Sequence, residues 1–99
     1  MYVGTLTLDL LLGDVRSLKQ KRSVVRPVVA ELRRRYAVAC AETDHLDLHR
    51  RAEVGVAVVA ADGAHCREVL DACEQSVAGR PELELLSARL DVRPARDED

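Results

Sequence analysis

Aromatic residues are almost missing from this chain of 99 residues, which has two tyrosines and neither phenylalanine nor tryptophan. Its core must therefore be built from valine, leucine and alanine, which supply most of the 47% hydrophobic content. A chain of this length forms one domain and buries about 60–65% of its unfolded surface, so the core has little to spare. We expect a single domain over residues 1–93 and a disordered acidic tail over residues 94–99.

Cysteine is also scarce, since the chain has only three cysteines and no CxxC spacing. A disulfide framework needs paired cysteines, and zinc or iron–sulfur sites need closely spaced thiolates. Cys40, Cys66 and Cys73 are therefore predicted to be reduced and buried. No cofactor is expected.

Long hydrophobic runs are missing as well, because no stretch of eighteen apolar residues occurs. The N-terminal segment MYVGTLTLDLLLG contains Asp9 and no basic residue, which is not typical of a signal peptide. These two absences predict a cytoplasmic protein with no membrane partner.

Charge is distributed unevenly, although the formal net charge is only -2. Residues 1–51 contain ten basic and six acidic residues, whereas residues 52–99 contain five and eleven. Between Arg16 and Arg35, eight basic residues accompany one acid, Glu31. The sequence thus predicts a surface with one basic side that the overall charge conceals.

Hydrophobic periodicity predicts six elements. A helix is expected from the capping box of Ser17 and Gln20 to Tyr36, and a second one from the N-cap Asp62 to Gly79. Period-two patterns predict four strands, at residues 2–12, 38–42, 52–60 and 82–92.

Two irregularities are expected within these elements. Pro27 lies inside the first helix, where it removes a hydrogen bond and clashes with the preceding turn. Either the helix is distorted there, or its regular part begins near Ser23; we keep one helix and expect a local distortion. The alternation of the last strand breaks at Leu85 and Leu86, which indicates a β-bulge.

The β-α-β-β-α-β order predicts a ferredoxin-like α+β fold, with a four-stranded antiparallel sheet and both helices on one face. The other face is then uncovered, and its residues are small or mildly polar. They are Thr5, Thr7, Ala39, Ala41, Gly55 and Ala57. RNA-binding modules of this fold stack bases on sheet aromatics, which this face lacks. It is better suited to packing against another sheet, so a homodimer through this open face is one prediction.

The basic residues of the first helix cluster when the helix is projected at about 100° per residue. Lys19, Arg22, Arg26 and Arg33 then share one sector, which loop residues such as Arg16, Arg50 and Arg51 could extend. Such an array suits a phosphate backbone. The alternative is a solvated helix flank whose long stems cover the edge of the core. The predicted nucleic-acid-binding residues are Lys19, Lys21, Arg22, Arg26, Arg33, Arg50 and Arg51.

Catalytic patterns are missing. We find no Ser/His/Asp or Cys/His arrangement, glycine-rich phosphate loop or convincing carboxylate pair, so the chain is not expected to be an enzyme. His45 and His49 are four residues apart and could bind a metal together with Glu42 if the segment were helical. The segment has the pattern of a turn instead, which favours solvated or capping histidines, and no metal site is predicted.

The segments SLKQKRSVV and DLHRRAEVGVAVVAADGAH resemble the YlxP family, small bacterial proteins of uncharacterised function. The similarity extends from MYVGTLTLDL to ELELLSARLDV, and it implies a ferredoxin-like fold and a bacterial cytoplasmic setting. Family members are often encoded near translation-initiation and ribosome-maturation factors, which implies contact with RNA or the ribosome. The matched positions are Ser17, Leu18, Lys19, Lys21, Arg22 and Ser23 in the first segment, and Arg51 and Ala52 in the second.

The chain departs from the family at two places. DLHRRA stands where DLWQRA is common, so His49 replaces an aromatic and Arg50 adds a charge. Pro27 stands where a helix-compatible residue is usual. The leading hypothesis is a non-enzymatic RNA- or ribosome-associated binding protein that uses its basic helix edge. The alternative is a homodimeric protein-interaction module with no direct nucleic-acid role.

Overall fold

The computed structural model describes residues 1–95. The order of its elements confirms the predicted β-α-β-β-α-β arrangement. The elements are β1 (Tyr2–Leu12), α1 (Leu18–Tyr36), β2 (Ala39–Asp44), β3 (Arg51–Ala60), α2 (Gly63–Ala78) and β4 (Leu83–Pro94).

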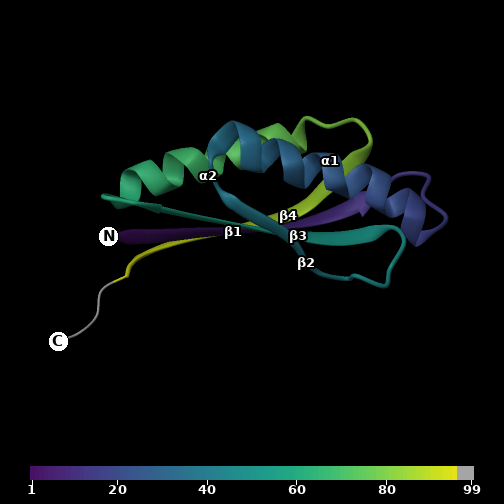
Figure 1. The fold of residues 1–99 in the computed structure, drawn as a ribbon, viewed down its shortest axis with the longest axis horizontal. Coiled ribbons are helices and arrows are strands. Elements are labelled where there is room, and N and C mark those ends of the chain that lie inside the picture. Colours follow the sequence, from purple (N-terminus) through teal and green to yellow (C-terminus); the bar gives the residue numbers. More distant parts are fainter. Residues whose placement is uncertain (96–99) are drawn as a thin grey trace.

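The four strands form one antiparallel sheet in the order β2-β3-β1-β4. Figure 1 shows both helices on the same face of this sheet, while the opposite face is open. β1 and β3 lie in the centre, as the two crossover connections require. The predicted ferredoxin-like α+β fold is therefore confirmed.

The core lies between the sheet and the helices and is aliphatic, as the lack of aromatics requires. Alternate β1 residues, Leu6, Leu8, Leu10 and Leu12, point towards the helices and are at most 1% exposed. α1 and α2 contribute buried residues at helical spacing. These are Val25, Val28 and Leu32 in α1, and Cys66, Leu70, Cys73 and Val77 in α2. Within residues 1–95, neither helix is long and apolar enough to cross a membrane.

The helix starts follow from local side chain to backbone hydrogen bonds. The Ser17 hydroxyl accepts from the Gln20 amide at 3.1 Å, and the Asp62 carboxylate accepts from the His65 amide at 2.8 Å. Both predicted N-caps are therefore confirmed. The Gln20 side chain accepts from the amide of Arg16 at 2.6 Å, one residue earlier than a capping box would place it.

The expectations for the bulge and for the C-terminal tail have different outcomes. The predicted bulge is confirmed, because β1 residues Asp9 and Leu10 pair with Ser87 and Leu85, which leaves Leu86 as the extra residue. Residues 94 and 95 do not belong to a disordered tail, because β4 continues to Pro94 and the Ala95 amide donates to the Met1 carbonyl at 2.9 Å. The rest of the predicted tail, residues 96–99, lies outside the described residues.

The three cysteines are free and buried, as predicted. Desolvation by burial raises the pKa of Cys40 and of Cys73 from 9.0 to about 11. The unfolded chain therefore loses these thiol protons first, and we expect the free energy of unfolding to fall as the pH rises from 9 towards 11. Urea titrations across this range should show the decline, and the Cys40→Ala/Cys73→Ala variant should show less of it. Equal slopes in the two proteins would contradict this origin.

Candidate nucleic-acid interface

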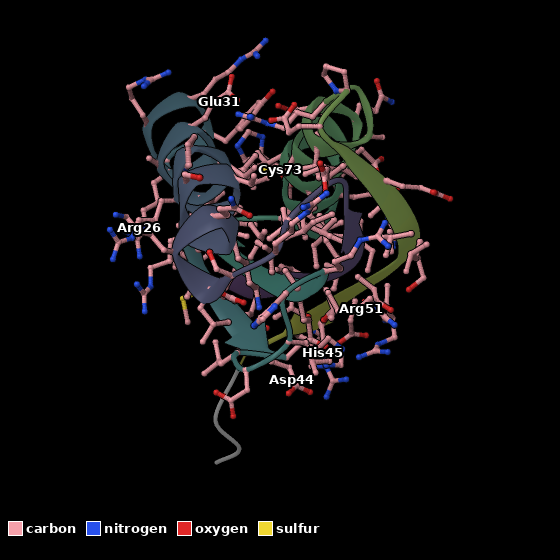
Figure 2. All side chains as sticks on the ribbon, turned by 90° about the vertical axis from the view of Figure 1, so that its right-hand side faces the viewer. Arg26, Glu31, Asp44, His45, Arg51 and Cys73 are labelled. Carbon is pink, nitrogen blue, oxygen red and sulfur yellow. The ribbon has the colours of Figure 1, made fainter. Side chains whose placement is uncertain are left out.

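Three exposed cations on the outer face of α1 line one shallow groove. They are Lys19, Arg22 and Arg26, and Ser17, Gln20, Ser23 and Pro27 complete the lining. We call this set of seven residues the basic groove. Figure 2 shows Arg26 projecting outward from α1 at the side of the molecule. The helical wheel of the sequence placed these three cations in one sector with Arg33, and the structure confirms the placement of the three but not of Arg33 in this groove.

The positive charge of the groove is not neutralised within the described chain. The single acid of α1, Glu31, pairs with Arg80 and lies 3.8 Å from Arg35. Figure 2 shows it on a different side of the helix from Arg26. Among residues 1–95, no ion pair engages the three groove cations. Their charges therefore remain available to an anionic partner.

Pro27 leaves one carbonyl of α1 without its α-helical hydrogen-bond donor. α1 continues as one helix from Leu18 to Tyr36, so the proline does not end it. In an α-helix the amide of residue 27 would donate to the carbonyl of residue 23, but proline has no amide hydrogen. The Ser23 carbonyl therefore has no helical donor, while the Ser23 hydroxyl donates to the Gln20 carbonyl at 2.6 Å. Ser23, whose carbonyl lacks this α-helical partner, lines the groove together with the three cations.

Lys21 does not belong to this surface, and the prediction that it contacts phosphate is corrected. It is only 2% exposed, its Nζ lies 2.7 Å from Glu42 Oε2, and it donates to the His45 carbonyl at 2.6 Å. Its position explains this burial, since Lys21 shares the buried face of α1 with Val25 and Val28 at helical spacing. Its charge fastens α1 to the end of β2.

The other predicted arginines are tied to the backbone or to the sheet. Arg33 Nε donates to the Cys40 carbonyl at 3.0 Å, so it holds α1 against β2. Arg50 Nε donates to the carbonyls of Leu12 and Gly13 at 3.1 and 2.9 Å. Each of these arginines thus uses one donor to connect two elements.

Arg51 lies on the open sheet face and donates to both Asp9 carboxylate oxygens at 2.7 Å. Figure 2 places it beside His45 and Asp44, across the end of the molecule from Arg26. The structure therefore does not bring Arg51 to the basic groove. The extension of the groove that the sequence suggested is not formed by this residue.

His45 and His49 lie in the loop between β2 and β3, which is not helical. His45 has a left-handed backbone with φ of 60°, and its Nε2 lies 4.0 Å from Asp9 Oδ1. The two imidazoles therefore do not share a helix face. In the described part of the chain, no group of three or more metal-ligating side chains is found.

The small residues that the sequence assigned to the open sheet face lie together, although charged Arg33 and Glu53 also line the same hollow and the Arg51–Asp9 pair lies on this face. Thr5, Thr7, Ala39, Ala41, Gly55 and Ala57 together line a shallow hollow over β1, β2 and β3. A Cβ at Gly55 would lie 2.8 Å from Thr43 Cγ2, so a side chain at this position would require Thr43 to move. The strand pairing brings these small residues into adjacent positions, as in the pairs of Thr5 with Ala57 and of Ala41 with Gly55.

These features define a ferredoxin-like α+β domain with a basic groove on its first helix and an open, small-residue sheet face. A family model described as "Protein of unknown function (DUF503)" matches residues 3–90, and the chain belongs to this family. A search of curated proteins finds no match to the chain. The expected membership in a family of uncharacterised small proteins is thereby confirmed.

Proposed function

We propose that this chain is a non-enzymatic RNA-binding protein that docks structured RNA, ribosomal RNA included, through phosphate contacts in the basic groove. The observation that carries the proposal is the set of three cations, Lys19, Arg22 and Arg26, which form no ion pair with any carboxylate of residues 1–95. The similarity of SLKQKRSVV to the YlxP family supports a ribosome-associated role in a bacterial cytoplasm. Family context of this kind is an association and adds to the physical argument without replacing it.

The spacing of the three cations in the basic groove suits a nucleic-acid backbone. Lys19 and Arg26 are seven residues apart, so they are separated by about 10 Å along the helix axis. A nucleic-acid strand carries one phosphate per about 3.4 Å of duplex axis, so the three cations can reach about three phosphates. Arginine adds forked donors that match phosphate oxygens, whereas lysine adds a point charge. The groove therefore supports backbone docking with little sequence preference.

The Ser23 carbonyl favours RNA over DNA. Its α-helical donor is missing because residue 27 is proline, and Ser23 lines the groove together with the three cations. A ribose 2′-hydroxyl can donate to such an acceptor, whereas deoxyribose cannot. RNA should therefore bind more tightly than DNA of the same sequence and strandedness.

Replacement of Lys19, Arg22 and Arg26 by alanine is expected to weaken RNA binding by about 10- to 100-fold at low salt, because three phosphate contacts are lost. The dependence of log K on log salt should become shallower by about 2 to 3, since fewer counterions are released. Fluorescence anisotropy with ribosomal RNA fragments, random RNA duplexes and the matching DNA duplexes measures both quantities across a salt series.

A matched control separates local contacts from net charge. The variant Arg35→Ala/Arg67→Ala/Arg93→Ala removes the same number of positive charges from exposed positions outside the groove, and it should retain most of the affinity. Equal losses in both triple variants would show that the groove is not the site. Absence of RNA binding by the wild-type chain even at low salt would reject the function itself.

A second candidate is a homodimeric protein-interaction module that pairs through the open sheet face. The hollow of small residues around Ala41 and Gly55 favours it, because two such faces can approach closely. The basic groove would then dock an acidic protein. Ala41→Arg would place a long charged side chain in the hollow and should dissociate such a dimer, whereas RNA docking in the groove should survive this substitution.

A further inference from the structure

We propose that β4 is a self-pairing edge, through which two copies of the chain join antiparallel about Leu90 into one continuous sheet. This interface differs from the open sheet face and from the basic groove. The two copies are held together by the backbone hydrogen bonds of an antiparallel strand pair and by two ion pairs, each between Arg89 of one copy and Asp91 of the other. The proposed partner is a second copy of this chain.

The two edges of the sheet are protected to different degrees. β2 has only six residues, its pairing with β3 is irregular between Glu42 and Asp44, and Arg33 of α1 reaches the carbonyl of Cys40. Short, irregular and covered edges resist pairing with other chains. β4 has twelve residues, and within residues 1–95 no side chain hydrogen-bonds to its backbone. β4 is therefore the edge that remains open to a partner strand.

The pleat and the bulge restrict which register two β4 strands can adopt. Two copies that pair antiparallel are related by a two-fold axis. Residues opposite each other in such a pair must face the same side of the sheet, so the residue at the axis has to lie opposite its own copy. Because of the bulge at Leu86, the alternation of side chains between the two sheet faces is reversed in the residues before it. Pairing between two copies of β4 therefore cannot extend past that point. A self-pairing strand is thus limited to residues 86–94.

Charge selects one register within that segment. An axis through Arg89 or Asp91 would bring like charges opposite each other, which opposes association. An axis through Leu90 places Arg89 of each copy opposite Asp91 of the other, and it uses all of residues 86–94. An axis through Val92 would also match opposite charges, but it leaves only residues 90–94 of the strand to pair. The Leu90 register is therefore the longest one with matched charges.

The side chains of this segment have the exposure that the proposal requires. The β1 neighbours of Arg89 and Asp91 are Thr7 and Thr5, which carry no charge, and within residues 1–95 Arg89 makes no ion pair. In the same part of the chain, Asp91 pairs only with the exposed Arg93 of its own strand, at 2.8 Å. On the helix side, Leu90 would lie against Leu90 of the second copy, which would cover more of this half-buried residue. Leu86, which is 42% exposed, would lie opposite Pro94 of the second copy.

Sedimentation velocity of the full chain over a micromolar concentration range tests the proposal with charge reversals. Arg89→Asp and Asp91→Arg each create two like-charge pairs across the axis, so each should raise the dimer dissociation constant by about tenfold or more. An equimolar mixture of the two variants restores opposite charges at both pairs and should recover a heterodimer. The double variant R89D/D91R should also recover the dimer, because it exchanges the two charges.

Two controls locate the interface. Arg67→Asp makes the same charge change on an exposed position of α2 and should leave the dimer intact. Circular dichroism of each variant checks that the fold is retained. A wild-type chain that stays monomeric at all concentrations would overturn the proposal, as would a dimer that tolerates both single reversals. A dimer lost with Ala41→Arg but kept with Arg89→Asp would assign the interface to the open sheet face instead.

Discussion

Replacement of Lys21 by methionine is expected to lower the free energy of unfolding by about 3 kcal/mol, because it leaves a mostly buried carboxylate without its counter-charge. Lys21 Nζ lies 2.7 Å from Glu42 Oε2, and the two side chains are 3% and 22% exposed. Methionine preserves most of the side chain's length and apolar contacts, so the loss reports on the ammonium group. It also removes the donor to the His45 carbonyl. Urea unfolding at neutral pH measures the change.

The neighbouring residue Lys19 supplies a matched control on the same helix. Lys19→Met makes the same chemical change at an exposed position, so its effect should stay within about 0.5 kcal/mol. The double variant Lys21→Met/Glu42→Leu should recover much of the lost stability, because an apolar pair needs no counter-charge. A Lys21→Met variant no less stable than Lys19→Met would show that water already solvates Glu42.

This difference between Lys19 and Lys21 shows that the cations of SLKQKR have different roles. Lys19 and Arg22 belong to the basic groove, whereas Lys21 points into the protein and fastens α1 to the end of β2. The basic character of this segment is therefore explained in part by folding alone. Losses of RNA binding in a Lys21 variant would need a stability measurement before they could be assigned to lost phosphate contacts.

The fold was predictable because each of its elements has a local signal. The alternation of β1, the N-caps Ser17 and Asp62, and the break at Leu86 each depend on residues adjacent in sequence. Those signals determine the order of the elements along the chain. The right-handedness of crossover connections then restricts the ways in which the strands can be arranged in the sheet. The limits of β4 were less accurate, because pairing with β1 extends the strand to Pro94.

The candidate site was predictable only where it lies on one helix face. The helical wheel brings Lys19, Arg22 and Arg26 together, and the same wheel places Lys21 with Val25 on the buried face, a signal present in the sequence. Lysine is rarely buried without a partner, and that partner, Glu42, lies far along the chain.

The roles of the more distant arginines depend on contacts that periodicity does not encode. Arg50 donates to the carbonyl of Leu12, and Arg51 pairs with Asp9, each at a separation of about forty residues. A pattern of charges along the sequence shows that a side chain is basic but not which long-range partner engages it. The basic groove consequently contains only Lys19, Arg22 and Arg26 of the residues that were predicted to contact nucleic acid.

Replacement of Gly4 by valine is expected to cost about 3 kcal/mol, because β1 and α2 meet at this residue with no room for a side chain. A Cβ at Gly4 would lie 2.8 Å from Leu70 Cδ1 and 3.1 Å from Cys66 Cβ. The first distance is too short for two carbon atoms, so α2 or Leu70 would have to move. Gly13 is the matched control, since a Cβ there would meet its nearest atom at 3.5 Å and Gly13→Val should cost much less. Urea unfolding of both variants measures the difference.

A double-mutant cycle tests whether the collision with Leu70 is the cause. Leu70 is fully buried, so Leu70→Ala alone should cost about 3 kcal/mol through lost contacts and the cavity it leaves. In the double variant, the valine side chain at residue 4 can occupy part of that cavity, while the truncated residue 70 no longer collides with it. The combined cost should therefore be smaller than the sum of the two single costs by at least about 1 kcal/mol. Additive costs would instead mean that the strain at Gly4 arises from Cys66 and the α2 backbone, which the Leu70 truncation leaves in place.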